Sequence, residues 1–332
     1  MLHLVKSNKL KSRLYFVIRK NLFHTHLSIM EVLSINRYIV IIFFILASLL
    51  AGCMKEKTIE PNEKSNYEIF EENGDIKVGL QIRNARTINF NVEEQEFSIV
   101  PIFEPYLEYI QKVEDQSINS YRELFHQIVV EPFRKTAFGE NGQWVKDHNS
   151  FKAPINIERL EESIQILDQD FDYFIQLIKE VMKEAANLLP GGKTTIYLFP
   201  FNPDQNIAIN IMNGVTAFAT SNHQIVLHIA PQKYDEEMLK YALAHEYYHV
   251  VYYEKYKNRK RDLVEYVLSE GKADSFANIL IPKFNAPWTK ELSPEGVNTI
   301  WSWIKERRYS FNETDLGEMR NGNREIPPCK NF

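Results

Sequence analysis

The sequence predicts an α+β fold that is mainly helical, with a small sheet directly before a long helix. Three observations support this prediction. Apolar residues recur at helical spacing through residues 105–189, β-rich runs follow between residues 194 and 229, and a second helical region extends from residue 235. With 332 residues, of which 44% are hydrophobic, the chain is long enough to bury a substantial core.

The charge of the chain argues against nucleic acid as a partner. Its 39 lysines and arginines are scattered rather than massed, they are set against 44 acidic residues, and the formal net charge is -5. A nucleic-acid-binding protein carries a concentrated basic surface, and this distribution does not indicate one. The two cysteines are too few for a disulfide framework.

The first 52 residues are typical of an export signal. Residues 38–50 form an uncharged apolar run that follows Arg37. The run ends in Leu50-Ala51-Gly52-Cys53, which resembles the bacterial lipobox, where a peptidase cuts before a cysteine that carries a diacylglycerol. This resemblance implies a lipid anchor on Cys53 and a location at the extracytoplasmic face of the cell membrane. An uncleaved membrane helix is the alternative, but such a helix needs about 20 apolar residues and this run is shorter.

Translation is expected to start at Met30, because the lead before the apolar run is otherwise long for a signal peptide. From Cys53 to residue 74 the chain is rich in charge and poor in apolar residues, which predicts a flexible tether. The folded domain is expected to comprise residues 75–332. Apolar and polar residues alternate over residues 76–82 and 88–92, which predicts two strands at its start.

The domain is expected to continue with a helical layer over about 105–189 and a region of sheet and metal-site helices over about 193–282. The layer ends at Pro190-Gly191-Gly192, a combination that breaks helices. Strands are predicted from Thr194 and over 224–229, with 214–220 as a candidate partner. Acidic residues at 235–237 suit the first turn of a helix that runs to about Tyr256.

The helix predicted from residue 235 carries the segment His245-Glu246-Tyr247-Tyr248-His249. Residues four apart lie on one helix face, so His245 and His249 present two imidazoles to a common point, with Glu246 beside them. Two neutral imidazoles suit Zn²⁺, which takes a carboxylate as third ligand and leaves one position open for water. The motif alone also occurs by chance, so a second element is needed.

A second helix, opened by the capping pair Asp262 and Glu265, supplies two carboxylates. Glu270 and Asp274 interrupt an otherwise apolar stripe, which comprises Leu263, Val267 and Ala277. Burying unpaired carboxylates is costly, and a metal together with a ligand histidine would satisfy both of them. Gly271 in mid-helix costs ~1 kcal/mol relative to alanine, so we expect the two helices to approach closely there.

The two segments together resemble the gluzincin-type metallopeptidases, in which HExxH is followed by ExxxD. The resemblance implies a zincin-like fold and a Zn²⁺ ion held by His245, His249 and Glu270. It also implies that Glu246 is the general base and that Asp274 orients a ligand histidine, expected to be His245.

Residues 105–332 are also similar to a bacterial family of predicted zinc-dependent proteases, through the segments YALAHEYYHVV, SEGKADSFA, QIVLHIAP and FRKTAFG. In that pattern a Gly- and Tyr-rich segment follows a proline pair, whereas here Pro327-Pro328 is followed only by residues 329–332. We therefore expect a shortened C-terminus that lacks any substrate-binding or transition-state group carried there. Cys329 is expected to be an exposed free thiol.

The sequence thus predicts a membrane-anchored, extracytoplasmic zinc metallopeptidase that hydrolyses peptide or protein substrates. Glu246 would take the proton of a metal-activated water, and the resemblance implies that an edge strand, expected at 224–229, holds the extended substrate. The leading alternative is an inactive zincin-fold lipoprotein that acts as a binding protein, and a weaker one is a solute-binding lipoprotein with an accidental motif. His228 is expected to be packed or solvent-facing, and the tyrosines at 247, 248, 252 and 253 are expected to be packing residues.

Overall fold

The computed structural model describes residues 67–72, 75–115, 120–220, 223–257, 261–289 and 292–326. All of these residues belong to one compact unit, Ser65–Phe332. The predicted signal peptide, the start at Met30, the lipid anchor at Cys53 and the thiol of Cys329 lie outside the described residues. No described helix combines the length and the apolarity that crossing a lipid bilayer requires.

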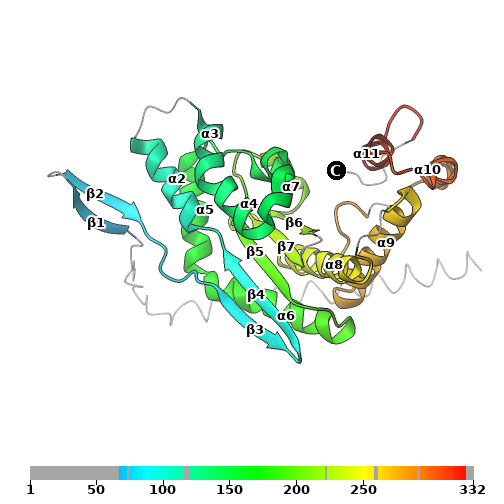
Figure 1. Cartoon of the computed structure of the whole chain (residues 1–332), viewed down its shortest axis with the longest axis horizontal. Helices are drawn as coiled ribbons and strands as arrows, with labels where there is room; N and C mark the ends of the chain where they lie inside the picture. Colours follow the sequence, from blue (N-terminus) through cyan, green and yellow to red (C-terminus); the bar gives the residue numbers. More distant parts are fainter. Residues whose placement is uncertain are drawn as a thin grey trace, which may run out of the picture. The chain divides into compact units, whose positions relative to one another are not determined.

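A five-stranded mixed sheet with the order β3-β4-β5-β7-β6 organises the described fold (Figure 1). Its strands are β3 (Ile88–Val92), β4 (Gln95–Pro101), β5 (Thr194–Pro200), β6 (Val215–Thr220) and β7 (Gln224–Ile229). β4, β5 and β7 run parallel, whereas β3 and β6 pair antiparallel with their neighbours.

The edge strand differs from the prediction. The strand at 224–229 was expected at the edge, but β7 lies between β5 and β6, and β6 is the edge strand. Every residue of β7 is buried. A strand covered on both faces reads as a continuous apolar run, so the sequence QIVLHI marks an interior position rather than an edge.

A separate two-stranded sheet precedes the main one. β1 (Tyr67–Glu72) pairs antiparallel with β2 (Asp75–Leu80). The predicted tether, which extended to residue 74, is therefore wrong for residues 67–72. The main-chain groups of β1 are hydrogen-bonded to β2, and the amino-acid composition of a segment does not report such pairing. The two strands predicted at 76–82 and 88–92 are present as β2 and β3.

Helices make up most of the remaining described chain. Before β5 these are α2 (Glu104–Asp115), α3 (Tyr121–Phe125), a π-helical turn at His126–Val130, α4 (Glu131–Phe138), 3₁₀ turns at Gly139–Asp147 and Asn149–Phe151, α5 (Ile157–Gln169) and α6 (Phe171–Leu188). After β5 these are α7 (Asn206–Ile211), α8 (Glu236–Lys255), α9 (Leu263–Leu280), α10 (Pro294–Arg307) and α11 (Glu313–Asn321). The predicted α+β class, mainly helical with a small sheet before the HEYYH helix, is confirmed.

Different helices pack against the two faces of the sheet through aromatic side chains. Phe199 of β5 packs against Phe133 of α4, with ring centroids 4.9 Å apart. On the other face, Phe97 of β4 packs against Tyr247 of α8 at 6.1 Å. Neighbouring residues of a strand point to opposite faces, so both sides of the sheet are buried and α8 is held against one of them.

A smaller apolar cluster fastens the last two helices to the start of α9. Leu263 of α9, Trp303 of α10 and Met319 of α11 are buried in it. The main-chain N–H of Leu263 also donates to the carbonyl of Ser310 at 2.9 Å. These contacts place α11, which is distant from α9 in sequence, beside the N-terminal half of α9.

Candidate metal centre

Helix α8 places the two motif histidines side by side. At its N-terminus the Asp235 carboxylate accepts a hydrogen bond from the Met238 N–H at 2.7 Å, which caps the helix as the acidic start predicted. His245 and His249 follow one turn apart, and their side chains are only 5% and 4% exposed. Their Nε2 atoms are 3.2 Å apart and their ring planes make an angle of 70°. Both rings therefore face one point.

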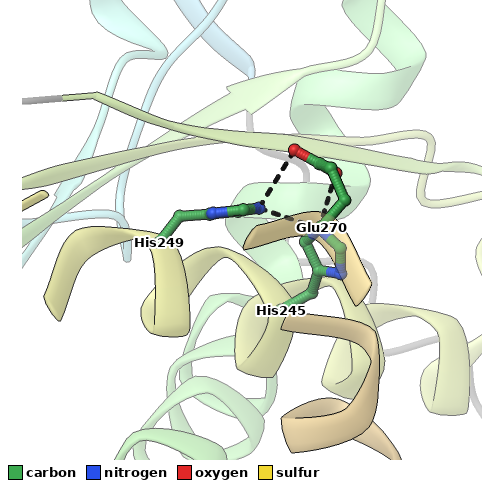
Figure 2. Close-up of side chains that lie close together, drawn as sticks. All are labelled: His245, His249 and Glu270. Atoms are coloured by element: carbon green, nitrogen blue, oxygen red, sulfur yellow. Dashed lines mark hydrogen bonds and ion pairs between the residues drawn. The ribbon is translucent and has the colours of Figure 1, made fainter. Parts of the chain in front are cut away.

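Helix α9 brings a carboxylate to the same point. Its N-cap is Asp262, whose side chain accepts from the Glu265 N–H at 2.9 Å, at the predicted start. Glu270 directs one oxygen to each histidine (Figure 2): Oε2 lies 3.5 Å from Nε2 of His245, and Oε1 lies 3.5 Å from Nε2 of His249. The structure thus brings together the three residues that the resemblance implied as ligands.

The spacing of these three residues fits a tetrahedral metal ion. Zn²⁺ binds nitrogen and oxygen ligands at about 2.0–2.1 Å, so two ligand atoms of a tetrahedron lie about 3.3–3.4 Å apart. The two Nε2 atoms are 3.2 Å apart and each lies 3.5 Å from a different oxygen of Glu270, which is close to that value. One ligand atom from each of the three residues lies within 4.8 Å of the other two. His245, His249 and Glu270 therefore form a group that could hold a metal ion.

Asp274 supports the first histidine from behind. Its Oδ1 lies 2.9 Å from Nδ1 of His245, and it also accepts from Nε1–H of Trp288 at 3.0 Å and from the Tyr241 hydroxyl at 3.2 Å. Such a contact keeps the Nδ1 proton on His245, so that Nε2 is free to serve as a ligand. Burial lowers the pKa of His245 in the metal-free site, but hydrogen bonds to Asp274 and Glu270 outweigh it and raise the pKa to about 9.

Glu246 contacts the edge strand β6. Its Oε2 accepts a hydrogen bond from the main-chain N–H of Ala219 in β6 at 2.7 Å. Burial raises the pKa of this carboxyl group, while the neighbouring His245 and His249 act in the opposite direction. The side chain is thus fixed by the sheet on one oxygen and lines the cavity beside the metal group.

A cavity of about 500 Å³ opens onto the three convergent side chains. The metal group and Glu246 line it from α8 and α9, and β6 forms one wall through Thr216, Ala217, Phe218 and Ala219. The rest of the cavity wall includes four residues that were not predicted from the sequence as site residues: Arg261, Tyr266, Trp288 and Arg320. These come from the ends of helices and from loops, where no spacing pattern indicates a common site.

Two other predictions concern histidine and tyrosine packing. His228 is packed as expected: it is 2% exposed, it stacks on Phe199 at 5.0 Å, and burial lowers its pKa to about 3. It also lines the cavity, and its ring nitrogens have no hydrogen-bond partner among the described residues. Tyr247 is buried, with its hydroxyl donating to the Leu189 carbonyl at 2.8 Å. Tyr253 does more than pack, because it stacks on His249 at 5.8 Å and lines the cavity.

The expectation for Gly271 is wrong. A Cβ atom added there would meet nothing within 4 Å, and the residue is exposed. α9 turns Glu270 and Asp274 toward α8, so the intervening Gly271 faces solvent rather than the helix contact. The structure offers no packing reason for glycine at this position.

Comparisons with known proteins agree with the geometry. No curated protein and no solved structure matches the chain. One family model does match, over residues 174–329, just under half of the 332-residue chain. The matched stretch contains α8 and α9 with His245, Glu246, His249, Glu270 and Asp274. It confirms the resemblance predicted from the motifs: this part of the chain is similar to the family described as "Predicted Zn-dependent protease (DUF2268)".

Proposed function

We propose that this chain is a zinc-dependent peptidase whose metal ion is held by His245, His249 and Glu270. The observation that carries the proposal is the convergence of these side chains at the wall of a cavity: the two Nε2 atoms are 3.2 Å apart and each lies 3.5 Å from one oxygen of Glu270. Three protein ligands are the number typical of catalytic zinc sites, whereas structural zinc sites have four. The family match supports the same activity.

The side chains around this position suit peptide hydrolysis. A zinc ion bound there would supply a water molecule whose pKa is lowered to ~7 and would polarise the scissile carbonyl. Glu246 accepts the proton of the attacking water and passes it to the leaving amine. Its hydrogen bond to Ala219 holds one carboxylate oxygen, so the group keeps its orientation toward the cavity during both transfers. Asp274 keeps Nε2 of His245 available as a ligand.

Edge strand β6 offers its main chain to an extended substrate. The N–H of Val215 donates to the Met212 carbonyl at 3.0 Å, and the N–H of Ala219 donates to Glu246, so both point away from β7. In an antiparallel strand the main-chain groups of alternate residues point to the same side, so those of Ala217 face the same open edge. Ala217 lines the cavity. A peptide strand would pair with it by strand addition, the role expected earlier for the strand at 224–229.

The membrane location is part of the proposal. It is supported by Leu50-Ala51-Gly52-Cys53 and by the apolar run before it, which resemble a lipoprotein export signal. With a lipid on Cys53, the peptidase would act on peptides or proteins outside the cytoplasm, close to the membrane that anchors it.

Replacement of the general base tests the proposal. The full chain, loaded with zinc, is incubated with a peptide library, with and without a chelator, and the products are identified by mass spectrometry. We expect Glu246→Gln to retain zinc and to lose cleavage by at least about 100-fold, because it removes proton transfer but no ligand. Glu237→Gln, an exposed carboxylate in the first turn of the same helix, is the matched control and should cleave normally.

The same assay separates the possible outcomes. Undiminished cleavage by Glu246→Gln would refute the assignment of the base. Stoichiometric zinc in the unchanged chain, with no product from any peptide, would show a zinc-binding protein without turnover, as in the leading alternative. Absence of bound zinc would reject the metal site itself.

A further inference from the structure

Two arginines reach the metal-group cavity from outside the motif segments. Arg261 precedes the N-cap of α9, and Arg320 lies in the last turn of α11. The guanidinium carbon of Arg261 lies 4.7 Å from the ring centroid of Tyr253 and 5.7 Å from that of Tyr266. The guanidinium of Arg320 lies 4.7 Å from the same Tyr266 ring. One aromatic ring thus supports two cations at the cavity wall.

The two cations have no acidic partner in the described part of the chain. Arg261 contacts the Ser269 hydroxyl at 3.5 Å, and no described carboxylate lies within ion-pair distance of either guanidinium. The acidic side chains of the cavity, Glu246 and Glu270, would be balanced by a divalent metal ion. Among the described residues, Arg261 and Arg320 then have no carboxylate within ion-pair distance to balance their positive charges.

We propose that Arg261 and Arg320 form a subsite that binds a carboxylate of the peptide substrate, an inference that rests on the proposed peptidase function. A guanidinium binds a carboxylate through two parallel hydrogen bonds, which its planar fork matches. Cation–π contacts with Tyr253 and Tyr266 hold both guanidinium groups at the cavity wall. A neutral main-chain carbonyl needs no such pair of charges, whereas an anion in the cavity would be neutralised by it.

Two sources can supply this carboxylate: the C-terminus of the peptide or an acidic side chain. The subsite and the metal group line one cavity, so a bound C-terminus would place the scissile bond close to the chain end. The enzyme would then remove C-terminal residues rather than cut within long chains. A bound acidic side chain would instead set a preference for glutamate or aspartate near the cleaved bond.

Equilibrium binding distinguishes these cases without turnover. Fluorescence anisotropy is measured on the zinc-loaded full chain with Glu246→Gln, so that the probes stay intact. The probes are a fluorescein-labelled alanine-phenylalanine hexapeptide with a free C-terminus, its C-terminal amide, and an amide that carries glutamate at the last position. We expect at least about tenfold tighter binding of one carboxylate probe than of the plain amide, since charged hydrogen bonds supply that much selectivity.

Matched variants assign the selectivity to the two arginines. Arg261→Gln and Arg320→Gln should each lower the acid-to-amide ratio several-fold, and Arg320→Lys should keep part of it because the charge remains. Arg308→Gln is the control, since Arg308 is exposed, stacks on Tyr309 and does not line the cavity. It should leave the ratio unchanged. In the chain with both arginines the acid-to-amide ratio should also fall as the salt concentration is raised, a measurement that involves no substitution of either arginine.

Each outcome has one meaning. Tighter binding of the free-acid probe supports binding of the peptide C-terminus at the subsite. Tighter binding of the amidated glutamate probe supports binding of an acidic side chain. Equal binding of all three probes, or a preference that persists in both glutamine variants, overturns the subsite. Selective binding without cleavage in the peptide digest would reject the peptidase proposal and support the carboxylate subsite. Cleavage without selective binding would support the peptidase proposal and reject the subsite.

Discussion

Replacing Asp274 by asparagine tests how far the second carboxylate of α9 contributes to metal binding. One oxygen of Asp274 accepts from Nδ1 of His245 at 2.9 Å, from Trp288 at 3.0 Å and from Tyr241 at 3.2 Å. Asparagine keeps an oxygen at that place but removes the negative charge. The substitution therefore separates electrostatic support of His245 from simple positioning of its ring.

The expected size follows from comparable partners of metal-bound histidines, whose loss typically weakens metal affinity by 10–100-fold, or ~1.4–2.7 kcal/mol. For Asp274→Asn we expect the lower end, about tenfold, because the acceptor for His245 remains. Asp274→Ala should approach about 100-fold, since it also leaves the donors of Trp288 and Tyr241 without this acceptor.

The assay is equilibrium competition for zinc between the full chain and a chromogenic chelator at neutral pH. Thermal unfolding of the metal-free proteins shows whether a variant has lost its fold. Asp172→Asn is the control, because Asp172 is an exposed carboxylate that pairs with Arg86 at 3.2 Å on the surface. A zinc affinity of Asp274→Asn within about twofold of this control would refute the reasoning, since a supporting carboxylate should cost at least about tenfold.

Two further predictions concern stability. Burial lowers the pKa of His228 to about 3, so its stabilising contribution is present above pH ~6.5 and is lost as the pH falls toward 3. Between pH 7 and pH 5 the unchanged chain should therefore lose ~2 kcal/mol more free energy of unfolding than His228→Phe, as measured by urea unfolding. An equal loss in the two proteins would contradict this. The buried Asp168 carboxylate accepts from the main-chain N–H groups of Arg83, Asn84 and Ala85 at 3.0, 3.0 and 2.7 Å. Asp168→Ala should cost about 3 kcal/mol or more in the same assay, and a loss below about 1 kcal/mol would show that water replaces these bonds.

Much of the metal group could be predicted because its parts are local. His245 and His249 meet through the 3.6-residue repeat of a single helix, which depends only on their spacing. Glu270 and Asp274 lie one turn apart on α9, and their place in an apolar stripe indicated that they face the protein interior. The cap at Asp262 fixed the start of that helix from sequence alone.

Other features required the packed chain. The partner of Glu246 is the main-chain N–H of Ala219, and a main-chain group leaves no signal in a residue pattern. The position of β6 at the edge depends on the order in which strands pair, whereas alternation and apolar runs report only burial. Gly271 was assigned to a helix contact because its residue type is unusual in mid-helix, but its direction around the helix axis points it to solvent.

The sequence alone was sufficient for the identity of the metal group and for the helices that carry it, because helix periodicity relates residues a few positions apart. It was not sufficient for the part of the cavity wall where Arg261 and Arg320 meet at the Tyr266 ring. That meeting depends on the apolar cluster of Leu263, Trp303 and Met319, which holds α11 against α9. Contacts between segments so far apart along the chain arise from burial of apolar surface in three dimensions, and no local spacing encodes them.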